Sequence, residues 1–386
     1  MKKIVQLILF CALATVLLVS CRELYTPPAI TAPSNYLVVE GLINTGTDST
    51  IIALSRTVSL NSKTTIKTEA KAKVTVESDA NASYPLKEIK TGTYASPSLG
   101  LNKTAKYRLR IITADNKTYL SDFIAGKDSP AIDSLGYAVQ PNGLQIYVNT
   151  HDATNNSRYY RWDYIETWNF HSQYSSSTIV SGNLFIDRTP DQQIFSCWAS
   201  DVSADIVLAS SAKLTQDVIY NSVITTVPSS AEKLSGLGYS ILVRQYALTQ
   251  DAFNFWQNLK KNTEQLGSIF DAQPSEIQGN IHNINNNAEP VFGYISAGTT
   301  QQKRITVLYD KWPIGWGTNR PTYASCIQDT VFNKDLSSFL GPAPLQIPLF
   351  GIPGPSGGII GYMGSSPLCV DCTLRGTNKK PSFWPN

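Results

Sequence analysis

Short runs in which apolar and polar residues alternate recur through the first third of the chain, and this period of two constrains the fold most strongly. In "KYRLRI", Tyr107, Leu109 and Ile111 fall on one face of a strand and the two arginines on the other. The runs extend from "YLVVEGLI" to "KTYLSDFI" at intervals of roughly ten residues, and Asn, Asp, Gly and Ser separate them. This pattern predicts an immunoglobulin-like β-sandwich over residues 34–127.

Tyr107 follows Leu101 in the arrangement of a tyrosine corner. In such a corner the tyrosine hydroxyl bonds to the backbone a few residues upstream. We therefore expect Tyr107 to be a structural latch of the first sandwich rather than a ligand contact.

The alternation continues beyond Pro130, where the stretch "GKDSPAIDSLGY" predicts a domain boundary. In "YYRWDYIETW", one face of a strand carries Tyr160, Trp162, Tyr164 and Glu166. Residues 128–386 are therefore predicted to form a larger β-sandwich-like domain, and the fold class is mainly β.

One helix is predicted to interrupt these strands near residues 250–266. Thr249 is a suitable N-cap for it, and Phe253, Trp256 and Leu259 follow at helical spacing. We expect this amphipathic helix to pack across the face of a sheet.

The tail "GPAPLQIPLFGIPGPSGGIIGYMGSSPLC" is rich in Pro and Gly, which predicts a long irregular loop. Apolar residues such as Leu345, Phe350 and Ile360 are unusual in a solvated linker. The tail is expected either to lie along its domain or to contact a partner, and both interpretations stay open.

Residues 1–20 have the layout of a secretory signal peptide, because two lysines precede an apolar run. The run ends in "LVSC", which resembles the bacterial lipobox. That resemblance implies cleavage before Cys21, a diacylglycerol on its thiol and an acyl chain such as palmitate on the new amine. Residues 21–33 would then form a lipidated, Pro-rich spacer. The alternative is an ordinary signal peptide or an uncleaved anchor, with Cys21 incidental.

A lipid at Cys21 would anchor the protein to a membrane. Arg22 stands where an Asp would suggest retention at the inner membrane, so we expect sorting to the outer membrane. Whether the protein faces the periplasm or the cell surface stays open.

Of the six cysteines, Cys11 and Cys21 belong to the leader and the anchor. The others predict structural disulfides in an exported protein, with the pairing left open: Cys197, Cys326, Cys369 and Cys372. The "CVDC" stretch could instead supply half a zinc site or a redox pair. No second Cys/His pair lies near it and no helix is predicted after it, so we expect neither a metal nor a cofactor.

Charged residues make up only 16% of the chain, and without the two leader lysines it is close to neutral. A nucleic-acid partner therefore has no electrostatic support. No P-loop, GxSxG or HExxH motif is present, and no catalytic residue is predicted. Most of Trp162, Trp168, Trp312 and Trp316 are expected to fill the core of the second sandwich. The stretch "KWPIGWGTNRPTY" suggests a surface loop, so Trp312 and Trp316 are the candidates for contact with a glycan, a peptide or a protein partner.

Four stretches carry a family resemblance: "YLVVEGLIN", "YYRWDYIETW", the helix block "YSILVRQYALTQDAFNFWQNLKKNTEQLG" and the closing "CVDCTLRGTNKKPSFW". Together they resemble the Bacteroidetes lipoproteins grouped as domain-of-unknown-function family 4249, over nearly the whole mature chain. The resemblance implies an outer-membrane lipoprotein, often encoded beside a SusC-like TonB-dependent receptor. It implies no enzymatic activity.

We therefore expect a non-enzymatic, lipid-anchored protein that assists a TonB-dependent receptor in capturing or taking up an extracellular ligand. One alternative is a structural or adhesive protein of the cell envelope. Another is a hydrolase with an unrecognised site, which a deep polar cleft with convergent carboxylates or a buried histidine would favour.

Overall fold

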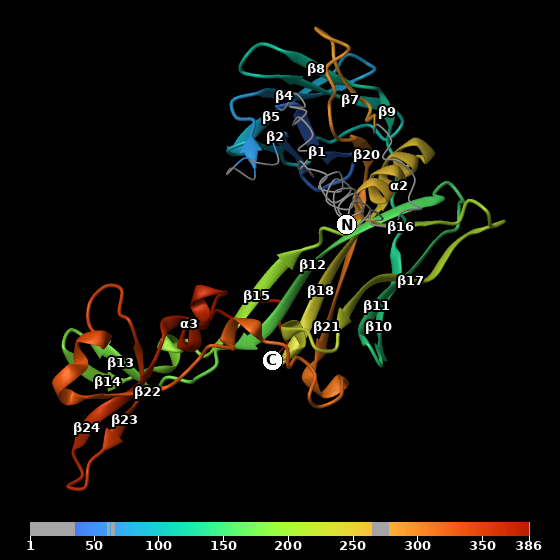
Figure 1. The fold of residues 1–386 in the computed structure, drawn as a ribbon. Coiled ribbons are helices and arrows are strands. Elements are labelled where there is room, and N and C mark those ends of the chain that lie inside the picture. Colours follow the sequence, from blue (N-terminus) through green and yellow to red (C-terminus); the bar gives the residue numbers. More distant parts are fainter. Residues whose placement is uncertain (1–34, 60–61, 63–65, 265–277, 386) are drawn as a thin grey trace, which may run out of the picture.

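The computed structural model of the protein describes residues 35–59, 62, 66–264 and 278–385. The predicted leader 1–20, the spacer 21–33 with Cys21, and the last two residues of the predicted helix lie outside the described residues. The described chain is mainly β and forms three bodies in a row, a first unit, a central sandwich and a distal lobe (Figure 1).

The first unit is a sandwich-like body whose strands lie in the order β19-β8-β7-β4-β5-β6-β2-β1-β20. The strand β5 passes between its two layers, because Ser83–Leu86 pairs with β4 and Lys87–Lys90 with β6. The strands are β1 (Leu37–Asn44), β2 (Thr50–Arg56), β3 (Lys67–Thr68), β4 (Lys73–Ser78), β5 (Ser83–Lys90), β6 (Thr93–Ser96), β7 (Lys106–Ile112), β8 (Thr118–Ser121), β9 (Ile124–Ala125), β19 (Ile281–Asn283) and β20 (Ser296–Gly298).

The first unit is not continuous in sequence, so the predicted boundary at residue 127 is incomplete. The later strand β19 pairs antiparallel with β8, and β20 pairs parallel with β1. Ile281, Val291 and Ile295 are buried in the same core as the first strands. The tyrosine corner is present, since the Tyr107 hydroxyl donates to the carbonyl of Asn102 at 2.8 Å.

The central sandwich packs two sheets face to face. One sheet has the order β10-β11-β17, and the other has the order β15-β12-β18-β21 with β16 paired to β12. Their strands are β10 (Ile132–Gln140), β11 (Gly143–Asp152), β17 (Asp217–Pro228), β12 (Tyr159–His171), β15 (Ser196–Val202), β16 (Val207–Ser210), β18 (Gly238–Ala247) and β21 (Thr300–Leu308). The predicted boundary stretch after Pro130 is therefore largely the strand β10.

The predicted inward face of β12 is confirmed, because Tyr160, Trp162, Tyr164 and Glu166 are all buried. Each large apolar side chain removed from water in this way contributes roughly 1.5–3 kcal/mol. The buried amide of Gln245 links the two sheets, since it accepts from the Trp162 indole at 3.0 Å and donates to the Thr150 hydroxyl at 3.1 Å.

The helix α2 (Gln250–Glu264) lies between the central sandwich and the first unit (Figure 1). Thr249 caps it, because its hydroxyl accepts from the amide of Ala252 at 3.2 Å. The ring of Phe253 packs on Tyr159 of the sheet, whereas Phe255, on another face, packs on Tyr294 of the returning segment. The helix is therefore wedged between two bodies rather than laid across one sheet.

The distal lobe, defined as residues 172–195 and 324–374, lies at the opposite end of the molecule from the first unit (Figure 1). It combines the connection between β12 and β15 with the tail of the chain. Its elements are β13 (Thr178–Ser181), β14 (Leu184–Asp187), β22 (Asp329–Phe332), β23 (Ile347–Pro353), β24 (Ile359–Ser365) and α3 (Pro367–Val370), with 3-10 turns including η5 (Asn333–Phe339) and η6 (Cys372–Leu374). The prediction of an irregular tail is therefore wrong for β23 and β24, which pair antiparallel.

Candidate functional site

Two disulfides hold the distal lobe together and fix it to the central sandwich. Cys326 is bonded to Cys369 within the lobe, and Cys197 of β15 is bonded to Cys372 of the tail. The predicted structural disulfides are thus confirmed, and one of the open pairings is selected.

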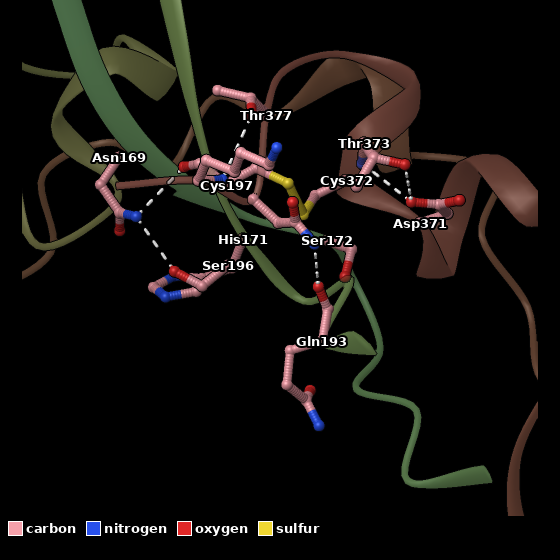
Figure 2. Close-up of a disulfide and its surroundings, with 12 residues drawn as sticks. Asn169, His171, Ser172, Gln193, Ser196, Cys197, Asp371, Cys372, Thr373 and Thr377 are labelled. Carbon is pink, nitrogen blue, oxygen red and sulfur yellow. Dashed lines mark hydrogen bonds between the residues drawn. A yellow bond between two sulfur atoms is a disulfide. The ribbon is translucent and has the colours of Figure 1, made fainter. Parts of the chain in front are cut away.

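The end of β12 and the turn after Val370 build the surroundings of the second disulfide (Figure 2). The side-chain amide of Asn169 donates to the Ser196 hydroxyl at 3.0 Å and to the carbonyl of Cys197 at 3.1 Å. On the tail, Asp371 caps η6, since its Oδ1 accepts from the amide of Thr373 at 2.8 Å. These bonds place Asp371 beside the junction between the central sandwich and the lobe.

A groove of about 450 Å³ runs between the two chain segments that form the lobe. This volume lies within the range of roughly 300–1,000 Å³ that is typical of small-molecule sites. Apolar residues make up most of its lining, but more of the exposed lining surface is polar than apolar, and three polar side chains contribute to it. The lining residues are Ile179, Val180, Gly182, Arg188, Ile194, Phe339, Gly341, Pro344, Gln346, Ile347, Pro348 and Asp371.

Arg188 is the cation of the groove. Its guanidinium donates to the carbonyl of Gln192 at 3.0 Å and to that of Thr178 at 3.3 Å, while its buried Nε has no partner within the described part of the chain. Among the described residues no carboxylate lies within ion-pair distance of it. Burial lowers the pKa of Arg188 below its usual value, and the charge of Asp371 partly opposes that shift.

One further buried polar atom of the groove lining, Oε1 of Gln346, lacks a partner within the residues that the structure describes. Leaving such a group unsatisfied costs roughly 1–3 kcal/mol, so an incomplete polar shell at a groove wall favours a binding site.

Several large apolar side chains are exposed on the lobe. Leu345 is 78% exposed, Ile327 is 74% exposed and Leu184 is 69% exposed. Residues 339–370, which include the hairpin of β23 and β24, contain no Asp, Glu, Lys, Arg or His. An exposed surface of this kind is typical of a contact with another molecule.

Other charged clusters stabilise the fold rather than forming a site. The buried carboxylate of Glu166 accepts hydrogen bonds from Lys233 and, at 2.6 Å, from Tyr239. On the outer sheet face, Asp163 accepts from Arg244 at 2.5 Å and from Tyr246 at 2.9 Å. In both clusters the charges are matched by partners in the same sandwich.

The two predicted contact tryptophans do not belong to the groove. Trp312 is only 8% exposed and lies in the core of the central sandwich, so the expectation of a surface side chain is wrong for it. The short turn η3 (Tyr309–Lys311) precedes it, and the chain then folds the ring inward. Trp316 is half-buried against the same core, and its part in ligand contact stays a prediction.

The residues of the groove had no local signal in the sequence. Arg188 directly follows an ordinary hairpin strand, and Gln346 stands among prolines. They come together only because the tail folds back onto the connection between β12 and β15.

No group of three or more His, Cys, Asp or Glu side chains is placed to hold a metal ion within the described residues. In the same residues, no helix is long and apolar enough to cross a bilayer.

Comparison with known families gives one match. The model of a family described as a domain of unknown function (DUF4249) matches residues 22–304. No curated protein matches the chain. The matched segment covers the first unit and most of the central sandwich, whereas much of the distal lobe lies beyond it.

Proposed function

The chain belongs to the DUF4249 family, and from this membership and the form of the distal lobe we propose that it is a lipid-anchored binding protein of the outer membrane. In this proposal it assists a TonB-dependent receptor in capturing or taking up an extracellular ligand. The first unit is the tethered end of the molecule and the distal lobe is the contact end.

The tether rests on the sequence. The apolar leader ends at Cys21, and the first unit begins soon afterwards. A single acyl chain binds a membrane only weakly, whereas several chains hold a protein there stably. Tethering in the membrane plane raises the local concentration of the protein, so that weak contacts with a receptor in the same membrane suffice.

The observation that carries the contact end is the exposed apolar surface of the distal lobe, with the uncharged segment 339–370, at the end of the molecule farthest from the first unit (Figure 1). An enzyme is the less supported function. The groove is lined by one carboxylate, Asp371, and by no histidine, which does not favour the hydrolase alternative.

Intact-mass analysis of the protein extracted from its native membrane tests the tether. We expect a chain beginning at Cys21 with the added mass of a diacylglycerol and an acyl chain. An unmodified N-terminus in the soluble fraction would contradict the proposal.

Purification from the outer membrane in mild detergent tests the receptor. We expect a large β-barrel receptor of the TonB-dependent class to co-purify. The matched comparison introduces a charge at one exposed apolar position in each end, Leu345→Glu in the distal lobe and Ile89→Glu in the first unit. Leu345→Glu should reduce recovery at least tenfold, since a charge at an interface centre costs about 2 kcal/mol or more. Equal recovery with both variants would count against the contact end.

A further inference from the structure

The groove of the distal lobe has the volume of a small-molecule site, with apolar side chains on both of its walls. Ile179 and Val180 of β13 form one wall, and Phe339 and Ile347 line the side formed by the tail. These segments are far apart in sequence, and the disulfide between Cys326 and Cys369 lies within the same lobe. A preformed groove of this kind accepts a ligand without first ordering its own walls.

The positive charge of the Arg188 guanidinium favours a negatively charged ligand in the groove. Main-chain carbonyls and the Ser176 hydroxyl hold it in place, but these groups are neutral, so within the described residues its positive charge has no ion-pair partner. A planar guanidinium matches a carboxylate in shape as well as in charge. The missing counter-charge is therefore best supplied by a carboxylate on the ligand.

Acceptor atoms on the groove narrow the class of ligand further. Asp371 uses Oδ1 to cap η6, and among the described residues no donor reaches its other oxygen (Figure 2). Gln346 presents a second acceptor without a donor. A ligand with a carboxylate and N–H groups fits both kinds of group in the groove. Its carboxylate pairs with the guanidinium, and its N–H groups donate to the acceptor oxygens. Asp371 would repel a dianion such as a phosphate about twice as strongly as a monoanionic carboxylate.

We propose that the groove binds an apolar peptide by its C-terminal carboxylate, with Arg188 pairing with the carboxylate and Asp371 and Gln346 accepting from the peptide N–H groups. This inference rests on the proposed role in ligand capture, but its test needs no receptor. A failure to co-purify a receptor and a failure to bind a peptide are therefore separate results.

The test uses the full chain purified in mild detergent and isothermal titration calorimetry with three probes. They are an N-acetylated tripeptide of alanine, valine and leucine with a free carboxylate, the same tripeptide as its C-terminal amide, and octanoate. We expect the free-carboxylate peptide to bind at least ten times more tightly than either of the others. If the amide binds as tightly as the free-carboxylate peptide, the pairing of Arg188 with the carboxylate is wrong. If octanoate binds as tightly, the ligand need not be a peptide. If no probe binds at millimolar concentration, both parts of the proposal are wrong.

Variants locate the binding within the molecule. Arg188→Gln should abolish the difference between carboxylate and amide. The matched control is Arg158→Gln, because Arg158 also donates to main-chain carbonyls, of Leu214 and Thr215, but lies in the central sandwich outside the groove. The assignment of the carboxylate to Arg188 would be contradicted if Arg188→Gln still bound the carboxylate peptide more tightly than the amide. It would also be contradicted if Arg158→Gln lost that difference. If Arg188→Gln disrupts the lobe, the three-probe comparison on the unaltered protein still decides the proposal.

Discussion

The central sandwich and the distal lobe are held together by different forces. In the sandwich, aromatic and aliphatic side chains from two sheets form one large buried cluster around Trp162 and Tyr239. The lobe's own cluster contains, among the described residues, only three buried members, Leu349, Cys369 and Val370. The lobe instead has one internal disulfide and a second one to β15.

This difference explains how the lobe can expose so much apolar surface. A body with a small core does not bury enough area to be stable alone, and cross-links commonly supply what the core lacks. Once cross-links fix the backbone, apolar side chains such as Leu345 need not be buried to maintain the fold. They stay exposed on the surface of the lobe.

Removing the internal disulfide gives the largest expected effect and tests whether the lobe depends on it. The cysteines Cys326 and Cys369 are 43 residues apart, so the chain-entropy model assigns the cross-link about 4 kcal/mol. In Cys326→Ala/Cys369→Ala we expect rapid proteolysis within the lobe while the central sandwich stays resistant. A lobe as resistant as that of the unaltered protein would show that its small core suffices.

A variant that removes a buried tyrosine hydroxyl tests the stability of the central sandwich, the other body in this comparison. Tyr160 is fully buried and donates to the carboxylate of Asp217, which is also buried. Tyr160→Phe leaves that carboxylate without one partner and should lower the free energy of unfolding by about 2 kcal/mol. Urea unfolding should report this loss in the sandwich, and proteolysis of the lobe should be unchanged.

Tyr164→Phe is the matched control for that change. Tyr164 is equally part of the core, but its hydroxyl donates to the exposed Asp205 at 3.0 Å. Water can replace the lost bond, so we expect a loss below about 1 kcal/mol. Equal losses in the two variants would refute the importance of burial at Asp217.

The smallest expected effect lies at the junction of the two bodies, where His171 ends β12 and stacks on Phe195 at 4.9 Å. Burial, followed by the charge of Arg320, lowers the pKa of His171 below its usual value. The unfolded chain therefore binds a proton more readily, and stability should fall as the pH drops below about 6.5.

Because His171 is only partly buried, this loss should stay below about 1 kcal/mol. His171→Phe keeps the ring stack and should remove the part of the pH dependence between about pH 7.5 and 5. Thermal unfolding at both pH values measures it. An unchanged pH dependence in the variant would show that other groups cause it.

Local periodicity was sufficient to predict most strands of the two sandwiches, and it failed where the chain departs from regular alternation. The strand β17 was not predicted, because its pairing with β11 shifts register and Asn221 adopts a positive φ of 48°. The return of β19 and β20 to the first unit had no local signal, since it is a pairing between distant segments.

The tail was predicted as a loop because Pro348 and Pro353 lie in it. The three-stranded sheet has the order β22-β24-β23, so β23 is an edge strand, where missing amide donors are tolerated. The groove could not be predicted at all. It requires the tail to lie against β13, and four cysteines alone permit three pairings.

Site-specific photo-crosslinking in intact cells tests most directly the claim that one end is the tether and the other the contact end. A photoreactive residue replaces Leu345 in the distal lobe or, for comparison, Ile89 in the first unit, which is 65% exposed. We expect a crosslink to a TonB-dependent receptor from position 345 and none from position 89. A receptor crosslink from position 89 alone, or equally from both, would contradict it.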